Sequence, residues 1–319
     1  MKLFRSLGEL PSDFGPVVAT IGNFDGVHLG HQWVIDQVKH RARELGCRSL
    51  VLTFDPHPVR LLRPEVPHLL ITPLEHKLDL LRKTDVDATV VLPFTRELSR
   101  MSARDFAKDL LARDLKIREV HEGENFRFGY QADADMDGLV EFGREYGFGV
   151  ESYAPFVLRG DAVSSSRIRT LITEGDMQHA RELLGRPFAV RSTPASGRGY
   201  GTRYAVPTIN LAPYAELLPA NGVYVTTLQV GEARVFQGVT NVGNRPTFGE
   251  DSFAVESHLL DFEPIALTEQ TPVELSFLKR LRGEKLWPNP EALREQIGND
   301  VREATRFFAL GETPQTTRV

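Results

Sequence analysis

Two histidines stand three positions apart in the stretch GNFDGVHLGH, which directly follows an apolar run. His28 and His31 can each donate a hydrogen bond to an anionic oxygen. Three glycines of the same stretch let the backbone come close to a ligand: Gly22, Gly26 and Gly30. A helix that begins here would add free N–H groups and a positive end. The pattern therefore favours phosphate binding, and it suits a nucleoside triphosphate.

Plainer interpretations of the histidine pair exist. Two histidines can simply occupy a turn, and an isolated H-x-G-H tetrad is more often of that kind. The position between a strand and a helix favours the phosphate site instead. Metal ligation is a minor alternative, because no third ligand stands at usable spacing.

A second stretch, VSSSRIRTLITEGD at 163–176, opens a helix with hydroxyl and guanidinium groups, which are phosphate ligands. A capped surface helix is the alternative, because serine is an ordinary N-cap. TFDPHP at 53–58 and EGENFRFG at 122–129 are expected to end two further strands at the same rim. Asn125, which we expect to be buried, fits a turn as well as a ligand contact.

A third group of residues lies in the second half of the chain. Thr208 and Asn210 follow a glycine-rich loop and are two positions apart, hence on one face of a strand. Two neutral oxygen ligands are what Mg²⁺ accepts when phosphates and water supply the rest; a strand-edge turn is the alternative. Glu256 lies in an alternating pattern, VESHLLDF. Next to an alcohol it is a general base, and on the solvent face it is an ordinary strand residue.

The first half of the chain alternates short apolar runs with helical patterns. The predicted strands cover 17–22, 49–54, 88–94, 117–123 and 148–156. The predicted helices cover 31–46, 72–83 and 102–113. This alternation predicts a doubly wound, Rossmann-like α/β domain whose parallel sheet is covered on both faces and whose ligands lie at the carboxyl ends of the strands.

After residue 186 the pattern changes to β-prone segments separated by Gly, Pro and Asn, which predicts an antiparallel barrel or sandwich. A closing helix over 289–310 is expected to pack on it through one apolar stripe: Leu293, Ile297, Val301, Ala304 and Phe308. Gly185 can end a helix and Pro187 cannot continue one, so we divide the chain into domains 1–185 and 186–319.

Composition excludes several classes of protein. A chain of 319 residues has room for about two domains. With 38 Lys and Arg against 43 Asp and Glu, the net charge of -5 provides no basic field for nucleic acid or anionic lipid. The single cysteine, Cys47, rules out an intramolecular disulfide, and no apolar stretch matches a signal peptide or a membrane span. We expect a cytoplasmic globular protein.

Eight motifs, in this order, resemble the bacterial bifunctional riboflavin kinase/FAD synthetase family over nearly the whole chain: GNFDGVHLGHQ, TFDPHP, GENFRFG, SSSRIR, PTINL, NGVY, NVGNRPTF and VESHLLDF. The resemblance implies an N-terminal FMN adenylyltransferase domain of the nucleotidyltransferase type and a C-terminal riboflavin kinase β-barrel. It implies that riboflavin and ATP give FMN, and that FMN and ATP then give FAD and pyrophosphate, with Mg²⁺. No nucleic-acid or membrane partner is implied.

In the adenylyltransferase half, the resemblance implies that His28 and His31 bind the ATP phosphates and stabilise the pentavalent transition state. Asn125 would contact ATP or FMN. The remaining ATP-binding residues that it implies are Gly22, Phe24, Asp25, Gly26, Ser165, Ser166 and Arg169.

In the kinase half, the resemblance implies that Gly197 and Gly199 bind ATP and that Thr208 and Asn210 help to coordinate Mg²⁺. Glu256 would take the proton from the 5′-hydroxyl of riboflavin as it attacks the γ-phosphate. Phosphoryl transfer of this kind asks for positioning, charge neutralisation and one base, and no covalent intermediate.

The sequence departs from the family pattern in three places. PTAN is replaced by PTIN, at a position expected to point away from the metal pair, and the loop before it reads GRGYGTRYAV. Three carboxylates follow FRFG: Asp133, Asp135 and Asp137. Near a polyphosphate they would repel it unless they faced solvent or Mg²⁺, so we expect a slower or more magnesium-dependent adenylyltransferase step.

Three other functions share some of these sequence features. Another nucleotidyltransferase with an attached β domain would share H-x-G-H, but PTIN and VESHLLDF argue against it. A nucleotide or flavin sensor without turnover is a second alternative, kept open by the altered loops. An aminoacyl-tRNA synthetase is disfavoured by the net acidity.

Overall fold

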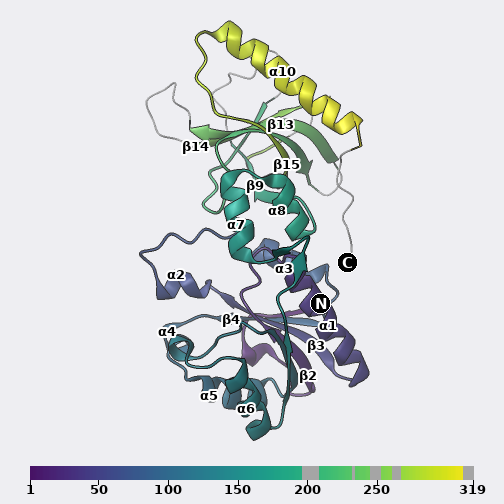
Figure 1. Cartoon of the computed structure of the whole chain (residues 1–319), viewed down its shortest axis with the longest axis vertical. Helices are drawn as coiled ribbons and strands as arrows, with labels where there is room; N and C mark the ends of the chain where they lie inside the picture. The colour runs from purple at the N-terminus through teal and green to yellow at the C-terminus, as the bar shows by residue number, and fades with distance from the viewer. Residues whose placement is uncertain (196–207, 232–233, 245–252, 261–266, 312–319) are drawn as a thin grey trace. The chain divides into compact units, whose positions relative to one another are not determined.

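The computed structural model describes residues 1–195, 208–231, 234–244, 253–260 and 267–311. The chain folds into two compact units, Met1–Ser165 and Ser166–Arg318 (Figure 1). The predicted residues Gly197 and Gly199 lie outside the described residues.

The first unit contains a six-stranded sheet in the order β1-β4-β3-β2-β5-β6, in which all neighbours are parallel. Its strands are β1 (Lys2–Phe4), β2 (Val17–Ile21), β3 (Arg48–Asp55), β4 (Ala88–Pro93), β5 (Ile117–Gly123) and β6 (Gly149–Tyr153). The five predicted strands are confirmed with small changes at their ends. The edge strand β1 was not predicted, because three residues are too few to form a pattern.

The helices of this unit are α1 (Leu29–Glu44), α2 (Pro58–Leu62), α3 (Leu74–Arg82), α4 (Arg96–Ser99), α5 (Ala103–Asp105) and α6 (Met136–Tyr146). The helices predicted at 31–46, 72–83 and 102–113 are present with shifted ends, whereas α2, α4 and α6 were not predicted. Shorter elements are the 3₁₀ turns η1 (Leu7–Glu9) and η3 (Tyr130–Ala132), the π-helical η2 (Phe106–Asp114) and the hairpin strands β7 (Val157–Leu158) and β8 (Asp161–Ala162). The helix predicted at 102–113 is thus divided between α5 and η2.

Helices cover both faces of this sheet, as predicted for a doubly wound fold. Successive side chains of a strand point to opposite faces. Ala19 of β2 belongs to a core formed with η2 and α6, whereas its neighbour Val18 packs with Val38 of α1. The order places β3 and β4 on one side of β2 and β5 and β6 on the other. The topological switch point therefore lies between β2 and β5, where such folds bind ligands.

The second unit opens with α7 (Ser165–Glu174) and α8 (Met177–Leu184) and contains a seven-stranded antiparallel sheet in the order β10-β11-β14-β13-β12-β15-β9. The strands are β9 (Phe188–Ser192), β10 (Pro194–Ala195), β11 (Thr208–Leu211), β12 (Gly222–Val230), β13 (Arg234–Asn244), β14 (Phe253–Leu259) and β15 (Val273–Gly283). The outermost strands β9 and β10 are separated by Thr193 alone. The sheet must therefore curl so that the end of β9 lies near the start of β10, which gives a half-barrel.

The two compact units divide at Ser165, earlier than the boundary predicted from sequence. Gly185 does end α8 in the left-handed conformation, at φ +72°, as predicted. However, α7 is bonded to the second sheet: Arg280 donates to the carbonyl oxygen of Glu174 at 3.1 Å, and the Ala220 N–H donates to that of Ile172 at 3.3 Å.

The closing helix is α10 (Pro290–Ala309), which lies along the curled sheet (Figure 1). The predicted apolar stripe is wrong for its first turns, because Leu293 and Ile297 are 39% and 43% exposed. Burial begins at Asp300, which is paired with Arg282 of β15 at 2.8 Å, and continues through Phe308. The N-terminal turns therefore do not pack on the sheet. Among the described residues, no helix has the length and apolarity needed to cross a membrane.

Candidate active sites

A cavity of about 210 Å³ lies at the switch point of the parallel sheet. We call it the switch-point pocket. It is lined by the ends of β2 and β5, the start of α1 and the segment after β6: Thr20, Ile21, Gly22, Phe24, His28, Gly30, His31, Trp33, Val34, Glu122, Gly123, Tyr153, Ala154, Pro155, Phe156 and Val163.

The two histidines stand together at one side of this pocket. His28 is the N-cap of α1, and its Nδ1 accepts a hydrogen bond from the His31 N–H at 3.2 Å. The two rings are stacked, with centroids 3.5 Å apart. A Cβ on Gly30 would meet the His28 ring at 3.3 Å, so a glycine leaves room for that ring. Because Nδ1 accepts, we assign the proton of the neutral His28 ring to Nε2, which can donate to a ligand.

The loop between β2 and α1 holds two non-glycine residues in the left-handed region. Phe24 has φ +48° and Val27 has φ +40°. Each such residue costs about 1–3 kcal/mol and persists only where the surrounding structure holds it. Both side chains are buried in one apolar cluster with Ile35 of α1 and Val86. Core packing therefore maintains the conformation of the loop between β2 and α1.

Three residues predicted to bind ATP hold this loop in place. The Asp25 carboxylate accepts from the N–H groups of Ile71 at 3.2 Å and Thr72 at 3.0 Å. The Gly26 N–H donates to the Thr72 hydroxyl at 3.0 Å, and the Ser165 hydroxyl donates to the Asp25 carbonyl at 2.8 Å. The described lining of the pocket includes none of Asp25, Gly26 and Ser165.

The other predicted contacts of the first site are not on this lining. Asn125 was expected to be buried, and this is wrong: it is exposed, in the turn that follows Gly123 at the end of β5. The Phe126 N–H closes that turn on the Gly123 carbonyl at 2.9 Å. Ser166 and Arg169 belong to the second compact unit.

The acidic segment after FRFG has partners of its own. Asp135 is the N-cap of α6, accepts from the Gly138 N–H at 3.2 Å and is paired with Arg127 at 2.9 Å. The Gly138 hydrogen bond holds the pKa of Asp135 below its ordinary value. Neither Asp133 nor Asp135 nor Asp137 is among the described residues that line the pocket. Asp135 therefore serves as the N-cap of α6.

A buried carboxyl group, Glu122, forms part of the pocket and was not predicted. Its Oε1 accepts from the Thr20 hydroxyl at 3.2 Å and from the Ile21 N–H. Burial raises its pKa to about 8, so the carboxyl is neutral at pH 7 and does not repel an anion. The sequence does contain a signal for this residue: a carboxylate inside a central strand of a parallel sheet is buried, because both faces of the sheet are covered.

We expect Glu122→Gln to remove a pH dependence of stability. The folded unit binds one more proton than the unfolded chain between the ordinary pKa of 4.5 and the folded pKa of about 8. The contribution of Glu122 is thus complete below pH 4.5 and is lost as the pH rises to about 8. The free energy of unfolding of the original chain, minus that of Glu122→Gln, should fall by about 1.4 kcal/mol for each pH unit in this interval.

Urea unfolding followed by Trp33 emission measures this effect in the first unit. Trp33 and Trp287 are the two tryptophans, so the measurement uses a Trp287→Phe background. Glu124→Gln, at an exposed position two residues away, is the matched control. A pH-independent difference for Glu122→Gln would contradict the assignment of a protonated carboxyl.

Aromatic side chains form another part of the pocket wall. The Trp33 and Tyr153 rings meet edge-to-face with centroids 4.8 Å apart, and Phe156 lies 6.2 Å from Trp33. Such rings can stack against a heteroaromatic ring. This wall was not predicted from sequence, because its residues come from α1, from the end of β6 and from the segment after it, and α1 is far from the other two in the chain.

A second group of polar residues lies on one face of the half-barrel. Asn210 of β11 and Asn241 of β13 are both paired with Glu256 of β14, and Thr208 is paired with His258. Paired residues of antiparallel strands share a face, with Cβ atoms about 4.5–5.5 Å apart. We call these five residues the β14 face.

The β14 face is the more accessible side of its strand. Glu256 and His258 are partly exposed, whereas Val255, Ser257 and Leu259 between and beside them are buried. Glu256 therefore lies on the more accessible face of its strand and not in the core, which leaves its role as a base a prediction. Ile209 is buried opposite Ser257, which confirms that this departure from PTAN points away from Thr208 and Asn210.

The donors of the β14 face suit a hard cation. Hydroxyl, amide and carboxylate oxygens are the ligand types that Mg²⁺ accepts. Among the described residues, no group of three or more His, Cys, Asp or Glu could hold a metal ion. Phosphate oxygens and water would have to complete the coordination.

Comparisons with known proteins assign the chain to a family. The sequence model of the FAD synthetase family matches residues 10–167, and that of the riboflavin kinase family matches residues 184–308. The bifunctional riboflavin kinase/FMN adenylyltransferase of Escherichia coli (strain K12) is 32% identical, over 97% of this chain and 99% of the relative. The chain belongs to the bifunctional riboflavin kinase/FMN adenylyltransferase family. It is a bifunctional enzyme of FAD biosynthesis.

A second relative agrees with this membership, and a solved structure shares the fold. The family member from Pseudomonas fluorescens is 34% identical, over 97% of this chain and 98% of the relative. A crystal structure titled macrolide-efflux protein from Streptococcus pneumoniae has a TM-score of 0.83 at 23% identity, covering 95% of this chain and 98% of that chain. At that identity the second likeness concerns the fold alone.

Proposed function

We propose that the switch-point pocket is the FMN adenylyltransferase site and that the β14 face is the riboflavin kinase site. The observation that carries this proposal is the location of each: the pocket lies within residues 10–167 and the β14 face within residues 184–308, which match the two corresponding families. We also keep 185/186 as the boundary between the two activities, because the kinase match begins at 184.

In the switch-point pocket, His28 and His31 would donate to the phosphates of ATP. A phosphate oxygen of FMN attacks the α-phosphorus, the bond from the α-phosphorus to the bridging oxygen breaks, and pyrophosphate leaves. Negative charge grows on the phosphate oxygens in the transition state, so donors held in place beforehand lower the barrier. The neutral Glu122 beside them avoids adding a like charge.

On the β14 face, Glu256 would accept the proton of the riboflavin 5′-hydroxyl as that oxygen attacks the γ-phosphorus of ATP. Thr208 and Asn210 would hold Mg²⁺, which neutralises phosphate charge when bound. Because Asn210 and Glu256 are cross-strand partners, the proposed base would lie beside a proposed Mg²⁺ ligand, which supports bringing the attacking hydroxyl and the phosphate together. Gly197 and Gly199 are retained as ATP contacts by family resemblance. A cytoplasmic location belongs to the same proposal.

We expect the purified chain to convert riboflavin, ATP and Mg²⁺ first to FMN and then to FAD. Chromatography of the flavins over time measures both steps. FMN alone would mean that the adenylyltransferase site is inactive, and flavin binding without conversion would favour a sensor. Either result would contradict the proposal that both sites turn over.

A further inference from the structure

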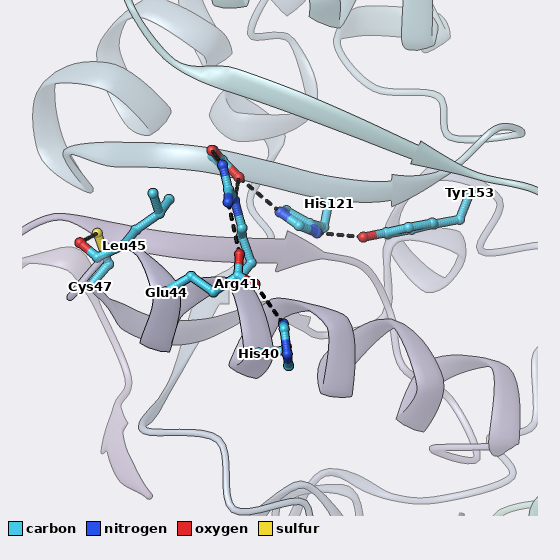
Figure 2. Close-up of polar contacts among 8 residues, drawn as sticks. His40, Arg41, Glu44, Leu45, Cys47, His121 and Tyr153 are labelled. Atoms are coloured by element: carbon cyan, nitrogen blue, oxygen red, sulfur yellow. Dashed lines mark hydrogen bonds and ion pairs between the residues drawn. The ribbon is translucent and has the colours of Figure 1, made fainter.

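Four polar side chains form a hydrogen-bonded chain that ends at Tyr153, a residue of the aromatic wall; Figure 2 shows Arg41, His121 and Tyr153 of this chain. The Tyr153 hydroxyl lies 2.8 Å from Nδ1 of His121, whose Nε2 lies 3.3 Å from Oε2 of Glu119. Arg41 closes the chain with two hydrogen bonds of 2.8 Å to the same carboxylate. We call these residues the Arg41–Tyr153 chain.

One arrangement of protons satisfies every member of this chain. The guanidinium of Arg41 can only donate, and its hydrogen bonds keep the pKa of Glu119 below its ordinary value, so that carboxylate accepts. Nε2 of His121 must then carry a proton. Burial lowers the pKa of His121, so the ring is neutral and its Nδ1 accepts from the Tyr153 hydroxyl. The direction of each hydrogen bond is thereby fixed.

Tyr153 connects this chain to the pocket. Of the four described members, Tyr153 alone lines the switch-point pocket, and it also borders a second cavity of about 280 Å³ that the other three line. Tyr153 is thus the member of the chain that borders both cavities. Its fixed partners are His121, which is 4% exposed in its side chain, and the edge-to-face Trp33 ring.

We propose that Arg41, Glu119 and His121 are positioning residues that act through Tyr153, and that they hold its ring as a surface on which a heteroaromatic ring of an adenylyltransferase substrate packs. This inference rests on the proposed function of the switch-point pocket. The cavity of about 210 Å³ is smaller than the roughly 300–1,000 Å³ of pockets that enclose drug-sized ligands, so it suits one ring system of a substrate. Adenine and isoalloxazine share this chemistry.

A double-mutant cycle tests whether the chain acts through the tyrosine hydroxyl. Tyr153→Phe keeps the ring and removes the hydroxyl; we expect KM of the substrate that packs there to rise about threefold to tenfold with kcat nearly unchanged. Arg41→Met should raise the same KM about twofold to fivefold. In the Tyr153→Phe background, Arg41→Met should not raise KM further, because the hydroxyl that connects residue 153 to His121 is already absent.

Two features of the experiment separate positioning from simple stabilisation. KM is measured for ATP and for FMN separately, which tells which ring system packs on Tyr153. Arg104→Met is the matched control, because Arg104 makes an equivalent set of contacts with Glu145 and the Tyr146 hydroxyl away from the pocket. Quenching of Trp33 emission by ATP, in a Trp287→Phe background, provides a binding readout that does not depend on turnover.

The outcomes are distinct. The inference would be overturned if Tyr153→Phe left KM for both ATP and FMN unchanged. It would also be overturned if the KM increases of Tyr153→Phe and Arg41→Met multiplied in the double variant. A loss confined to kcat would overturn it as well. His28→Ala is assayed in parallel: if FAD synthesis survives it, the proposed site is wrong, and if FAD synthesis is lost while Tyr153→Phe is silent, only the positioning role fails. Riboflavin kinase activity verifies that the second unit of each variant is intact, and urea unfolding followed by Trp33 emission verifies the first unit.

Discussion

Glu256→Gln should lower the rate of FMN formation by about 10²–10⁴-fold, the usual contribution of a general base, while conversion of FMN to FAD continues. The amide keeps the size of the side chain and its place opposite Asn210 and Asn241, but it cannot take up the proton of an attacking hydroxyl. The loss should therefore appear in kcat, with little change in KM for riboflavin or ATP.

Separate assays with riboflavin and with FMN as substrate measure this division. Glu274→Gln is the matched control: it changes a carboxylate of the same sheet that is paired with Arg191 at 2.6 Å. The control should retain both activities. Loss of both activities in Glu256→Gln would show that the two reactions do not use separate sites.

His28→Ala should have the opposite effect, with FAD formation reduced by about 10²–10³-fold and riboflavin phosphorylation retained. A magnitude of this order is typical when one donor to transition-state charge is removed. Nδ1 of His28 is occupied by the His31 N–H, so the group lost toward the ligand is Nε2–H. That donor is present in the neutral ring, and the reaction should therefore not require a protonated histidine.

His28 is also the N-cap of α1, and loss of a cap costs about 0.5–2 kcal/mol of stability. His28→Asn separates the two roles, because asparagine is a good N-cap whose shorter side chain does not extend to the position of Nε2. We expect it to restore stability without restoring FAD formation. Recovery of FAD formation in His28→Asn would reduce the role of His28 to capping.

The sequence was sufficient for the framework around both sites. Continuous apolar runs and helical periodicity predicted the parallel strands and the helix that begins after His28, because burial on both faces of a parallel sheet leaves that signal. The register of the second sheet was not predictable in detail. Thr208 and Asn210 were expected to share a face, but their pairing with His258 and Glu256 depends on contacts between distant segments.

The missed residues share a physical cause. Glu122 and His121 are polar side chains inside a strand, and their meaning depends on which neighbours cover them. The roles expected for Asp25 and Ser165 came from their place in motifs, whereas their side chains hold the loop that carries His28. The exposed Leu293 and Ile297 show a further limit: periodicity identifies a helix face but not how far its partner extends.

Under the proposed function, the left-handed residues Phe24 and Val27 would link nucleotide affinity to the integrity of the core. Their conformation persists because their side chains are buried with Ile35 and Val86, so this conformation of the loop and the folded cluster are populated together. By thermodynamic linkage, a nucleotide bound at the proposed site would stabilise the first unit by an amount set by its concentration and affinity. Mutations that loosen the cluster would reduce the competent fraction and weaken apparent affinity without touching the nucleotide.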